Sequence, residues 1–151
     1  MGREKPVEND YRDFISALNK YGVDYLIIGA YSVIFHTNIP RETKDFDVWI
    51  RRSEENADKC VKAIKEFCGL KIEKSDLLGK KEIFFIGIEP NRIDIFNDQE
   101  GFSFSEAYSH KKAGIFKGVK AYFISKEDLI KVKKYFKRDA DIKDLKRLRK
   151  A

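Results

Sequence analysis

The chain has 151 residues, 42% of them hydrophobic, which is enough for one domain with a buried core and excludes a disordered chain. Charged residues make up 37% of the chain, and its net charge of +6 favours an anionic partner such as a nucleotide or a nucleic acid. The sequence contains no run of about 18 apolar residues, so no transmembrane helix is predicted. Residues 1–6 lack the apolar core of a signal peptide.

The first half of the chain is expected to alternate helices with strands. Apolar residues recur at helical spacing over Asp10–Lys20, and Gly22 ends that helix. The expected elements that follow are a strand over Tyr25–Ile28, a helix over Ala30–Thr37, a strand over Asp45–Ile50 and a helix from the cap Ser53 to Cys68.

The second half is expected to contain two hairpins and to end in helices. In chain order the expected elements are strands over Lys81–Ile88 and Arg92–Phe96, a short helix near Ser105–Ser109, strands over Ala113–Phe116 and Val119–Ile124, and helices over Lys126–Lys137 and Asp139–Arg149. This order departs from the strict alternation of a doubly wound fold. We therefore expect an α/β (α+β) fold in one domain over residues 1–151, with a mixed sheet flanked by helices, a core at about 10–124 and a helical tail at about 125–150.

The two cysteines are expected to be free thiols. Cys60 and Cys68 fall on one expected helix, where their spacing places them about 12 Å apart along the axis. That distance is too long for a disulfide bond within the chain. Reduced cysteines are typical of a cytoplasmic protein.

Three aspartates stand in segments that are otherwise rich in β-branched and aromatic residues: Asp45, Asp47 and Asp94. Aspartate is depleted in strands, and side chains two residues apart in a strand point to the same face. Asp45 and Asp47 should therefore face one way, where two carboxylates repel each other unless a cation lies between them. Mg²⁺, which prefers oxygen ligands, fits that position. The alternative is a solvated pair of charges at the end of a strand.

A candidate phosphate site precedes the acidic pair. The apolar run Tyr25–Ile28 ends at Gly29, and the residues that follow suit the first turns of a helix. Such a junction presents free backbone N–H groups to an anion, and glycine lets the backbone approach a phosphate closely. Ser32 would add a hydroxyl donor. The alternative is a turn without a ligand.

This combination resembles the nucleotidyltransferase superfamily, which has the polymerase β-like fold. The matching parts are Gly29-Ala30-Tyr31-Ser32, then Asp45-Phe46-Asp47, and a third carboxylate, Asp94, on a later strand. More narrowly, the run from Pro40 to Asp47 and the stretch from Arg138 to Leu145 resemble small standalone nucleotidyltransferases of the AbiEii type, which often accompany toxin–antitoxin loci. The chain differs from that pattern at Ala30, where the family usually has a second glycine or a serine.

The resemblance implies an Mg²⁺-dependent enzyme, with Mn²⁺ as the alternative ion, that transfers a nucleoside monophosphate from a nucleoside triphosphate (NTP) to a protein or RNA acceptor and releases pyrophosphate. Asp45, Asp47 and Asp94 would be the catalytic and metal-binding residues. The residues expected to bind the nucleotide are Gly29, Ala30, Ser32, Arg41, Thr43, Lys133, Arg138 and Asp141. The expected partners also include a cognate toxin or antitoxin and a second copy of the chain, but no membrane.

Several of these residues also have simpler interpretations. Arg41 either reaches a phosphate or is a solvated loop residue, and Thr43 either orients the following strand through its hydroxyl or is a plain β-former. His36, near the end of its short helix, is better explained as a packed or capping residue than as a base.

The basic run from Lys131 to Lys150 also leaves two interpretations open. Because Asp139, Asp141 and Asp144 lie within helical reach of its lysines and arginines, it fits a solubilising face of paired charges. It also fits a contact with the backbone of RNA or DNA. Aromatic residues interrupt it only at Tyr135 and Phe136, which gives little support to base stacking.

Three hypotheses for the function remain. The first is the Mg²⁺-dependent nucleotidyltransferase. The second is a catalytically degenerate member of the same fold that binds a nucleotide or a partner protein without turnover. The third is a basic nucleic-acid-binding or antitoxin-like module in which the aspartates are incidental. Substitution of Asp45 or Asp47 by asparagine separates them, because only the first loses a catalytic activity.

Overall fold

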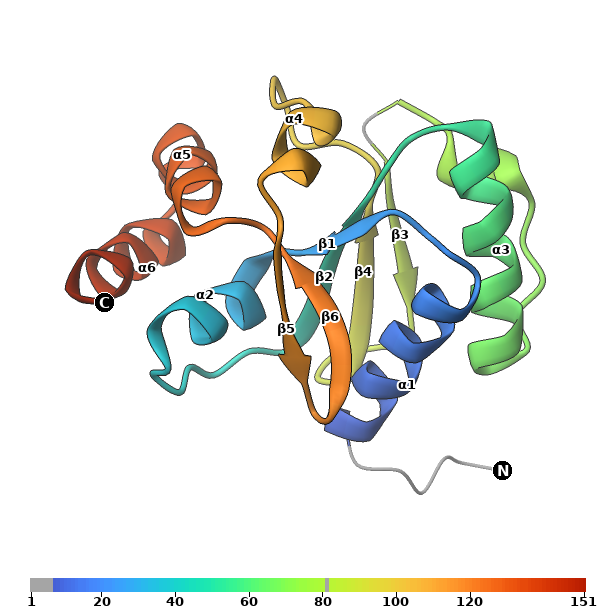
Figure 1. Ribbon diagram of the computed structural model, residues 1–151, viewed down its shortest axis with the longest axis horizontal. Coiled ribbons are helices and arrows are strands. Elements are labelled where there is room, and N and C mark those ends of the chain that lie inside the picture. Colours follow the sequence, from blue (N-terminus) through green and yellow to red (C-terminus); the bar gives the residue numbers. More distant parts are fainter. Residues whose placement is uncertain (1–6, 81) are drawn as a thin grey trace.

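The computed structural model describes residues 7–80 and 82–151 (Figure 1). The expected absence of a signal peptide concerns residues 1–6, and the expected start of a strand at Lys81 is a single position, so both lie outside the described residues. The elements are α1 (Val7–Lys20), β1 (Tyr25–Ile27), α2 (Gly29–Thr37), β2 (Asp45–Ile50), α3 (Glu54–Cys68), η1 (Lys74–Leu77), β3 (Ile83–Ile86), β4 (Arg92–Phe96), α4 (Phe104–Ser109), β5 (Lys112–Phe116), β6 (Val119–Phe123), α5 (Lys126–Phe136) and α6 (Asp139–Lys150).

The expected helices and strands are present, with small shifts at their ends. The 3₁₀ turn η1 is an addition, and the strand β3 is shorter than the expected Lys81–Ile88. Ser53 caps α3 as predicted, and Ser125 caps α5 in the same way. Each side chain accepts a hydrogen bond from a backbone N–H in the first turn of its helix. The serine caps therefore fix where these two helices begin.

A mixed sheet of six strands, in the order β3-β4-β2-β1-β6-β5, forms the centre of the molecule. Strand β2 runs parallel to β4 and antiparallel to β1, and β1 runs parallel to β6. This arrangement confirms the predicted α/β class with a mixed sheet. The register between β2 and β4 places Asp47 beside Asp94 and Asp45 beside Arg92.

Each face of the sheet has its own buried core. Helices α1 and α3 cover one face, where Phe46 and Val48 of β2 are fully buried and Tyr11 stacks on Phe46 with ring centres 4.7 Å apart. The other face packs against α4 and α5 around Trp49, which meets Phe104 edge to face at 5.2 Å. Because successive strand residues alternate between faces, Asp45 and Asp47 lie on the Trp49 side.

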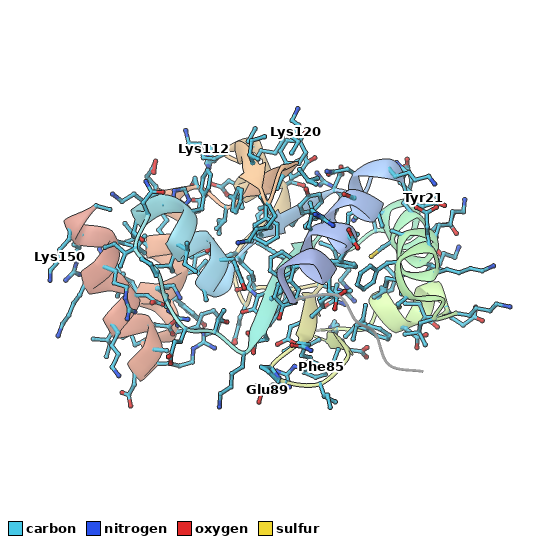
Figure 2. All side chains as sticks on the ribbon, turned by 90° about the horizontal axis from the view of Figure 1, so that it is seen from below. Tyr21, Phe85, Glu89, Lys112, Lys120 and Lys150 are labelled. Atoms are coloured by element: carbon cyan, nitrogen blue, oxygen red, sulfur yellow. The ribbon has the colours of Figure 1, made fainter. Side chains whose placement is uncertain are left out.

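Helices α5 and α6 pack beside each other at one end of the molecule, and α3 lies at the opposite end (Figures 1 and 2). Lys150 marks the far end of α6 in the view of all side chains (Figure 2). Within the described residues no helix is long and apolar enough to cross a membrane. Cys60 is buried, Cys68 is exposed, and both are free thiols, as their spacing predicts.

Candidate active site

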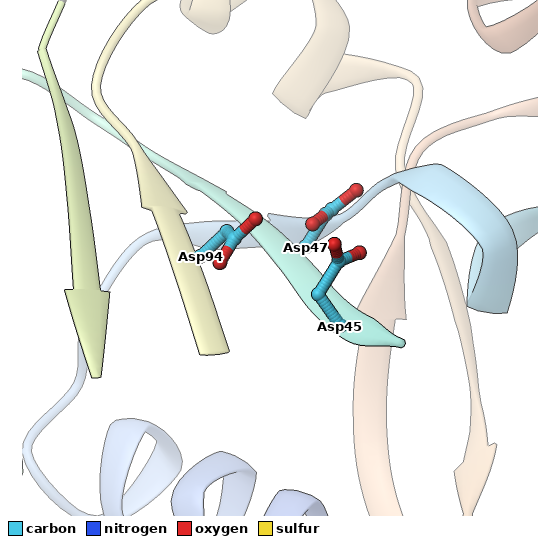
Figure 3. Close-up of side chains that lie close together, drawn as sticks. All are labelled: Asp45, Asp47 and Asp94. Atoms are coloured by element: carbon cyan, nitrogen blue, oxygen red, sulfur yellow. The ribbon is translucent and has the colours of Figure 1, made fainter. Parts of the chain in front are cut away.

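Three carboxylates converge on the Trp49 side of the sheet, two from β2 and one from the neighbouring β4 (Figure 3). Asp45, Asp47 and Asp94 each offer an oxygen atom, and these three atoms lie within 4.8 Å of one another. Asp47 Oδ1 is buried and makes no hydrogen bond to any described residue. We call these residues the aspartate triad.

The triad concentrates negative charge that its surroundings do not fully balance. Burial, followed by the charges of Asp45 and Asp94, raises the pKa of Asp47 to about 8. Burial and the charge of Asp94 also raise the pKa of Asp45, although a hydrogen bond with Asp47 and the positive charge of Arg92 act to lower it. Three oxygen ligands, one of them buried and without a partner, fit a hard divalent cation such as Mg²⁺.

One side chain that the sequence analysis did not single out already contacts the triad. Arg92 donates from Nε to Asp94 Oδ1 at 2.6 Å and from Nη2 to Asp94 Oδ2 at 3.0 Å. The same Nη2 lies 3.5 Å from Asp45 Oδ2. The guanidinium also stacks over Phe85, 4.4 Å from the ring centre. Because Arg92 stands two residues before Asp94 on a strand, both side chains point to the same face of the sheet. That spacing could have predicted the contact from the sequence.

Gly29 brings the start of α2 against the triad. Its φ of +67° lies in the left-handed region, and a Cβ added there would overlap the Asp47 carboxylate and lie 3.0 Å from Asp47 Cβ. The backbone N–H of Ile28 donates to the Asp47 carbonyl at 3.0 Å. None of the described side chains caps the first turn of α2, so its N–H groups at Gly29 and Ala30 face a possible anion.

Ser32 differs from its expected role as a phosphate donor. Its side chain is fully buried, and its hydroxyl donates to the Gly29 carbonyl at 2.6 Å. The Ser32 hydroxyl proton is therefore donated within the turn and is not available to a phosphate, because this side chain points into the protein. In this structure Ser32 stabilises the Gly29 turn from within.

Thr43 and His36 adopt structural roles that the sequence analysis had considered. The Thr43 hydroxyl donates to the Asp45 carbonyl at 2.8 Å, which is the hydrogen bond expected of a residue that orients the strand carrying the triad. His36 Nε2 lies 2.7 Å from the Ile124 carbonyl oxygen, and burial lowers the pKa of this imidazole. His36 is thus a packed residue that joins α2 to the end of β6.

A buried set of charges, which we call the α5–α6 ion network, joins the tail helices to the loop before β2. Lys133 is 6% exposed, and its Nζ lies 3.2 Å from Asp141 Oδ1 and 3.0 Å from Asp144 Oδ2. Arg41 donates two hydrogen bonds to Asp144, from Nε to Oδ1 at 2.7 Å and from Nη2 to Oδ2 at 3.2 Å. Arg138 donates from Nε to Asp141 at 2.7 Å, and Arg147 donates from Nη1 to Asp144 at 2.9 Å.

These positions change the interpretation of two predicted residues. Arg41 is neither a solvated loop residue nor free to reach a phosphate, because Asp144 occupies its guanidinium. Lys133 is not part of a solvated helix face, because it is buried between two carboxylates. Burial acts to raise the pKa of Asp144, but Arg41 and Lys133 outweigh it and hold that pKa below its ordinary value. Asp144 had no predicted site role, although Arg138, Asp141 and Asp144 recur at helical spacing.

A cavity of about 280 Å³ lies between the triad face of the sheet and the tail helices. It is lined by Gly29 and Asp47 on one side and by Lys133, Arg138 and Asp141 on the other. Leu129, Val132 and Phe136 give it an apolar wall. The cavity therefore brings together residues from β2, the α2 turn, α5 and α6 that are far apart in the sequence.

A sequence profile of the family "Nucleotidyltransferase of unknown function (DUF6036)" matches residues 7–149. The chain belongs to this family. The match confirms the nucleotidyltransferase superfamily that the Gly29 turn and the aspartates suggested. No curated protein matches the chain significantly.

Solved structures share the nucleotidyltransferase fold at low sequence identity. A solution structure of the antibiotic-resistance factor ANT(2'')-Ia has a TM-score of 0.65 and 16% identity, covering 93% of this chain and 81% of that chain. A crystal structure of ANT(2'')-Ia in complex with adenylyl-2''-tobramycin has a TM-score of 0.60 and 12% identity, covering 93% and 86%. An antigenic nucleotidyltransferase-like protein from Paracoccidioides brasiliensis has a TM-score of 0.58 and 16% identity, covering 93% and 75%.

The predicted site residues fall into two groups. Five of them line the cavity, namely Gly29, Asp47, Lys133, Arg138 and Asp141. Asp45 and Asp94 adjoin Asp47, and Ala30 follows Gly29 in the first turn of α2. The other three residues do not line the cavity and make hydrogen bonds elsewhere. Arg41 binds Asp144 of the network, Thr43 binds the Asp45 carbonyl in β2, and Ser32 binds the Gly29 carbonyl in the turn. The cavity also has acidic lining residues that were not predicted, Glu82, Asp98 and Glu100.

Proposed function

We propose that this chain transfers a nucleoside monophosphate from an NTP to a hydroxyl group of an acceptor and releases pyrophosphate. The observation that carries the proposal is the triad, in which Asp47 lines the cavity and has a buried carboxylate oxygen that lacks a partner among the described residues. A buried acceptor atom without a donor is unfavourable unless a ligand completes it. A divalent metal ion is the ligand whose chemistry matches three carboxylates.

Asp45 and Asp47 would hold this ion, and Asp94 would complete the site. When bound, the ion supplies positive charge that neutralises the triphosphate and favours in-line displacement at the α-phosphorus. In the reaction the acceptor oxygen forms a bond to the α-phosphorus, and the bond from that phosphorus to the β-phosphate oxygen breaks. We assign Asp94 to accept the proton of the acceptor hydroxyl.

The remaining assignments concern the triphosphate. The backbone N–H groups of Gly29 and Ala30 start α2 and would bind phosphate oxygens at its positive end. Lys133 shares the cavity with Asp47 and acts to lower the pKa of that carboxyl, which supports a position where its charge also reaches a phosphate. Asp144 and Asp141 would act as positioning residues that aim Lys133. Arg138, at the rim of the cavity, would contact the outer phosphate.

A fold neighbour solved with adenylyl-2''-tobramycin supports the view that this fold can accommodate a nucleotidyl group joined to an acceptor. We propose a protein or RNA acceptor for this chain, an AbiEii-like setting with a toxin or antitoxin partner, association with a second copy, and a cytoplasmic location consistent with two free thiols.

Thermal unfolding with each NTP, with and without Mg²⁺, tests the proposal. A ligand that binds only the folded state raises its stability by mass action. We expect a rise in Tm that needs both NTP and Mg²⁺, disappears in Asp47→Asn and persists in Asp24→Asn, whose carboxylate pairs with Arg51 outside the triad. Transfer of label from an NTP labelled at its α-phosphate should follow the same pattern. A rise that survives in Asp47→Asn would place the nucleotide elsewhere and refute the proposed site.

The same experiment separates the competing hypotheses. A degenerate member of the fold would show the rise in Tm but no transfer of label to any acceptor. A nucleic-acid-binding module with incidental aspartates would show neither, and Asp47→Asn would leave its affinity for nucleic acid unchanged or stronger because a negative charge is lost.

A further inference from the structure

The net charge of the chain is confined to its tail helices. Residues 126–151 contain 11 lysines and arginines against 5 aspartates and glutamates, whereas residues 1–125 contain 20 of each. The whole net charge of +6 therefore belongs to α5, α6 and their short flanks, and the rest of the molecule is neutral. Such a division biases the electrostatic field of the molecule toward the end that carries the tail helices.

The acidic residues of the tail do not cancel this charge at its surface. Asp141 and Asp144 are buried in the α5–α6 ion network, so only Glu127 and Asp139 are exposed acids in the tail. The exposed basic residues are Lys131, Lys134, Lys137, Arg138, Lys143, Lys146, Arg149 and Lys150. We call these eight residues the basic surface. Helical pairs do form in the run, between Arg138 and Asp141 and between Arg147 and Asp144, but the exposed lysines outnumber the exposed acids.

The basic surface includes a regular stripe along α6. Lys143, Lys146 and Lys150 are spaced by three and four residues, so they project from one side of the helix over about 10 Å. Among the described residues no carboxylate forms an ion pair with any of these three lysines. Lys150 extends from the outer end of the molecule in Figure 2. The stripe is thus open to a ligand with regularly spaced negative charges.

The basic surface leads to the cavity of the proposed active site. Arg138, whose side chain is 68% exposed, belongs to the surface and also lines the cavity. Phe136 and Lys133 continue the same wall inward toward Asp47. A flexible polyanion that lies along α6 and bends around its first turn at Arg138 would place one end toward the triad. A cavity of about 280 Å³ admits the end of a single strand and is too small for the width of a duplex.

We propose that the basic surface binds the phosphate backbone of a single-stranded nucleic acid and presents its terminal hydroxyl to the triad. This inference rests on the proposed function and names the acceptor class for it. A membrane is a poorer match, because binding to lipid needs an apolar face, and Tyr135 and Ile142 are the only large apolar side chains exposed on the described part of α5 and α6. Contacts go to phosphates and carry no sequence specificity.

A charge-matched pair of triple variants tests the surface. The first is Lys143→Gln with Lys146→Gln and Lys150→Gln on α6, and the control is Lys59→Gln with Lys62→Gln and Lys65→Gln on α3 at the opposite end. Both lower the net charge by the same amount. Fluorescence anisotropy with single-stranded RNA and DNA oligonucleotides of one sequence would measure affinity over a range of salt concentrations, without metal or NTP.

We expect the α6 variant to bind at least about tenfold more weakly and to lose about 2 from the slope of log K against log salt, since each phosphate contact contributes about 0.7 for single strands. The α3 control should bind within about twofold of the original protein. Equal losses in the two variants, or no loss in the α6 variant, would overturn the proposal. So would equally tight binding of polyglutamate, which would indicate an acidic protein partner.

Two further arms complete the test. The double variant Lys131→Gln with Lys134→Gln on α5 should also weaken binding, and it replaces the α6 variant if circular dichroism shows the latter unfolded. RNA binding with little DNA binding would assign RNA as the acceptor, and the reverse would assign DNA. Binding that persists in Asp47→Asn while this variant loses its NTP-dependent rise in Tm separates the surface from the active site. Lost binding with an intact rise in Tm would refute only the surface.

Discussion

Aspartates are buried in two regions of this molecule, and the charges around them differ. In the α5–α6 ion network, Asp141 and Asp144 are almost completely inaccessible, yet each has two or more cationic partners and a pKa below its ordinary value. In the triad, Asp47 is more accessible, yet one of its oxygens has no partner among the described residues and its pKa is raised to about 8. Cationic partners keep the buried carboxylates of the network charged, whereas the unpaired oxygen of the triad is open to a ligand.

The largest expected effect comes from removing the cation of the network. Lys133→Met leaves Asp141 and Asp144 buried beside fewer positive charges, and breaking a buried ion pair from one side costs about 3–5 kcal/mol. Urea unfolding should show this loss of stability. Lys134→Met, which changes an exposed lysine on the same helix, should lose less than about 0.5 kcal/mol. Equal losses would mean that the network does not stabilise the fold.

The Gly29 turn gives the next largest effect, because its backbone and its neighbour both exclude a side chain. Gly29→Ala places a Cβ against Asp47 and also occupies a left-handed conformation. The backbone alone costs about 1–2 kcal/mol, and overlap with Asp47 adds about 1–3 kcal/mol. Urea unfolding and the NTP-dependent rise in Tm would measure stability and binding in the same variant.

Gly22→Ala is the matched control for that substitution. Gly22 has a φ of +70°, and a Cβ there meets no atom within 4 Å, so it shares the backbone cost without the overlap. We expect Gly22→Ala to lose about 1–2 kcal/mol and to keep the response to NTP. If the two variants behave alike, the contact between Gly29 and Asp47 has no importance of its own.

Much of this comparison was visible in the sequence. Asp45 and Asp47 at alternate strand positions, and Gly29 between a strand and a helix, predicted the triad face and the turn because strand and helix periodicity fix where side chains point. The spacing of Arg138, Asp141 and Asp144 indicated charges on one face of a helix. Partners across the fold could not be predicted from that spacing, since the pairing of Arg41 with Asp144 depends on how α6 packs against the loop before β2.

Ser32 illustrates a different limit of the sequence. Its place after the glycine suited a phosphate donor, but whether a hydroxyl in the first turn points outward or back to its own helix depends on rotamer and packing. Its bond to the Gly29 carbonyl is local, yet no pattern of neighbouring residues distinguishes it from an exposed serine.

The pH dependence of stability isolates the unpaired carboxylate. A carboxyl whose folded pKa is raised binds its proton more tightly in the folded state, so stability is greatest below the unfolded pKa and falls as pH rises. For Asp47 the fall spans from about pH 4 to about pH 8. Without metal, Asp47→Asn should lack this fall and should exceed the original protein by about 2 kcal/mol at pH 8.5, less than the shift alone implies because Asp47 is partly exposed.

Urea unfolding at several pH values in the presence of a chelator would measure that difference. The informative quantity is the free energy of unfolding of Asp47→Asn minus that of the original protein, because titrating groups that do not interact with Asp47 cancel in it. A difference that stays constant from pH 5 to pH 8.5 would show that Asp47 is not strained by burial and repulsion. Added Mg²⁺ should then remove the pH dependence of the original protein.

The smallest expected effect concerns Arg92. This residue already neutralises part of the negative charge of the triad, whereas the carboxylates of the α5–α6 ion network are fully paired with cations. Its guanidinium holds both oxygens of Asp94 and reaches Asp45, so a divalent ion must enter against its charge. Arg92→Gln should therefore bind Mn²⁺ about tenfold more tightly by titration calorimetry, although the variant loses contacts at the site. Arg51→Gln is the matched control, since Arg51 pairs with Asp24 and stacks over Phe104 in the same way but away from the triad. Weaker Mn²⁺ binding in Arg92→Gln would mean that Arg92 orients Asp94 for the metal and does not compete with it.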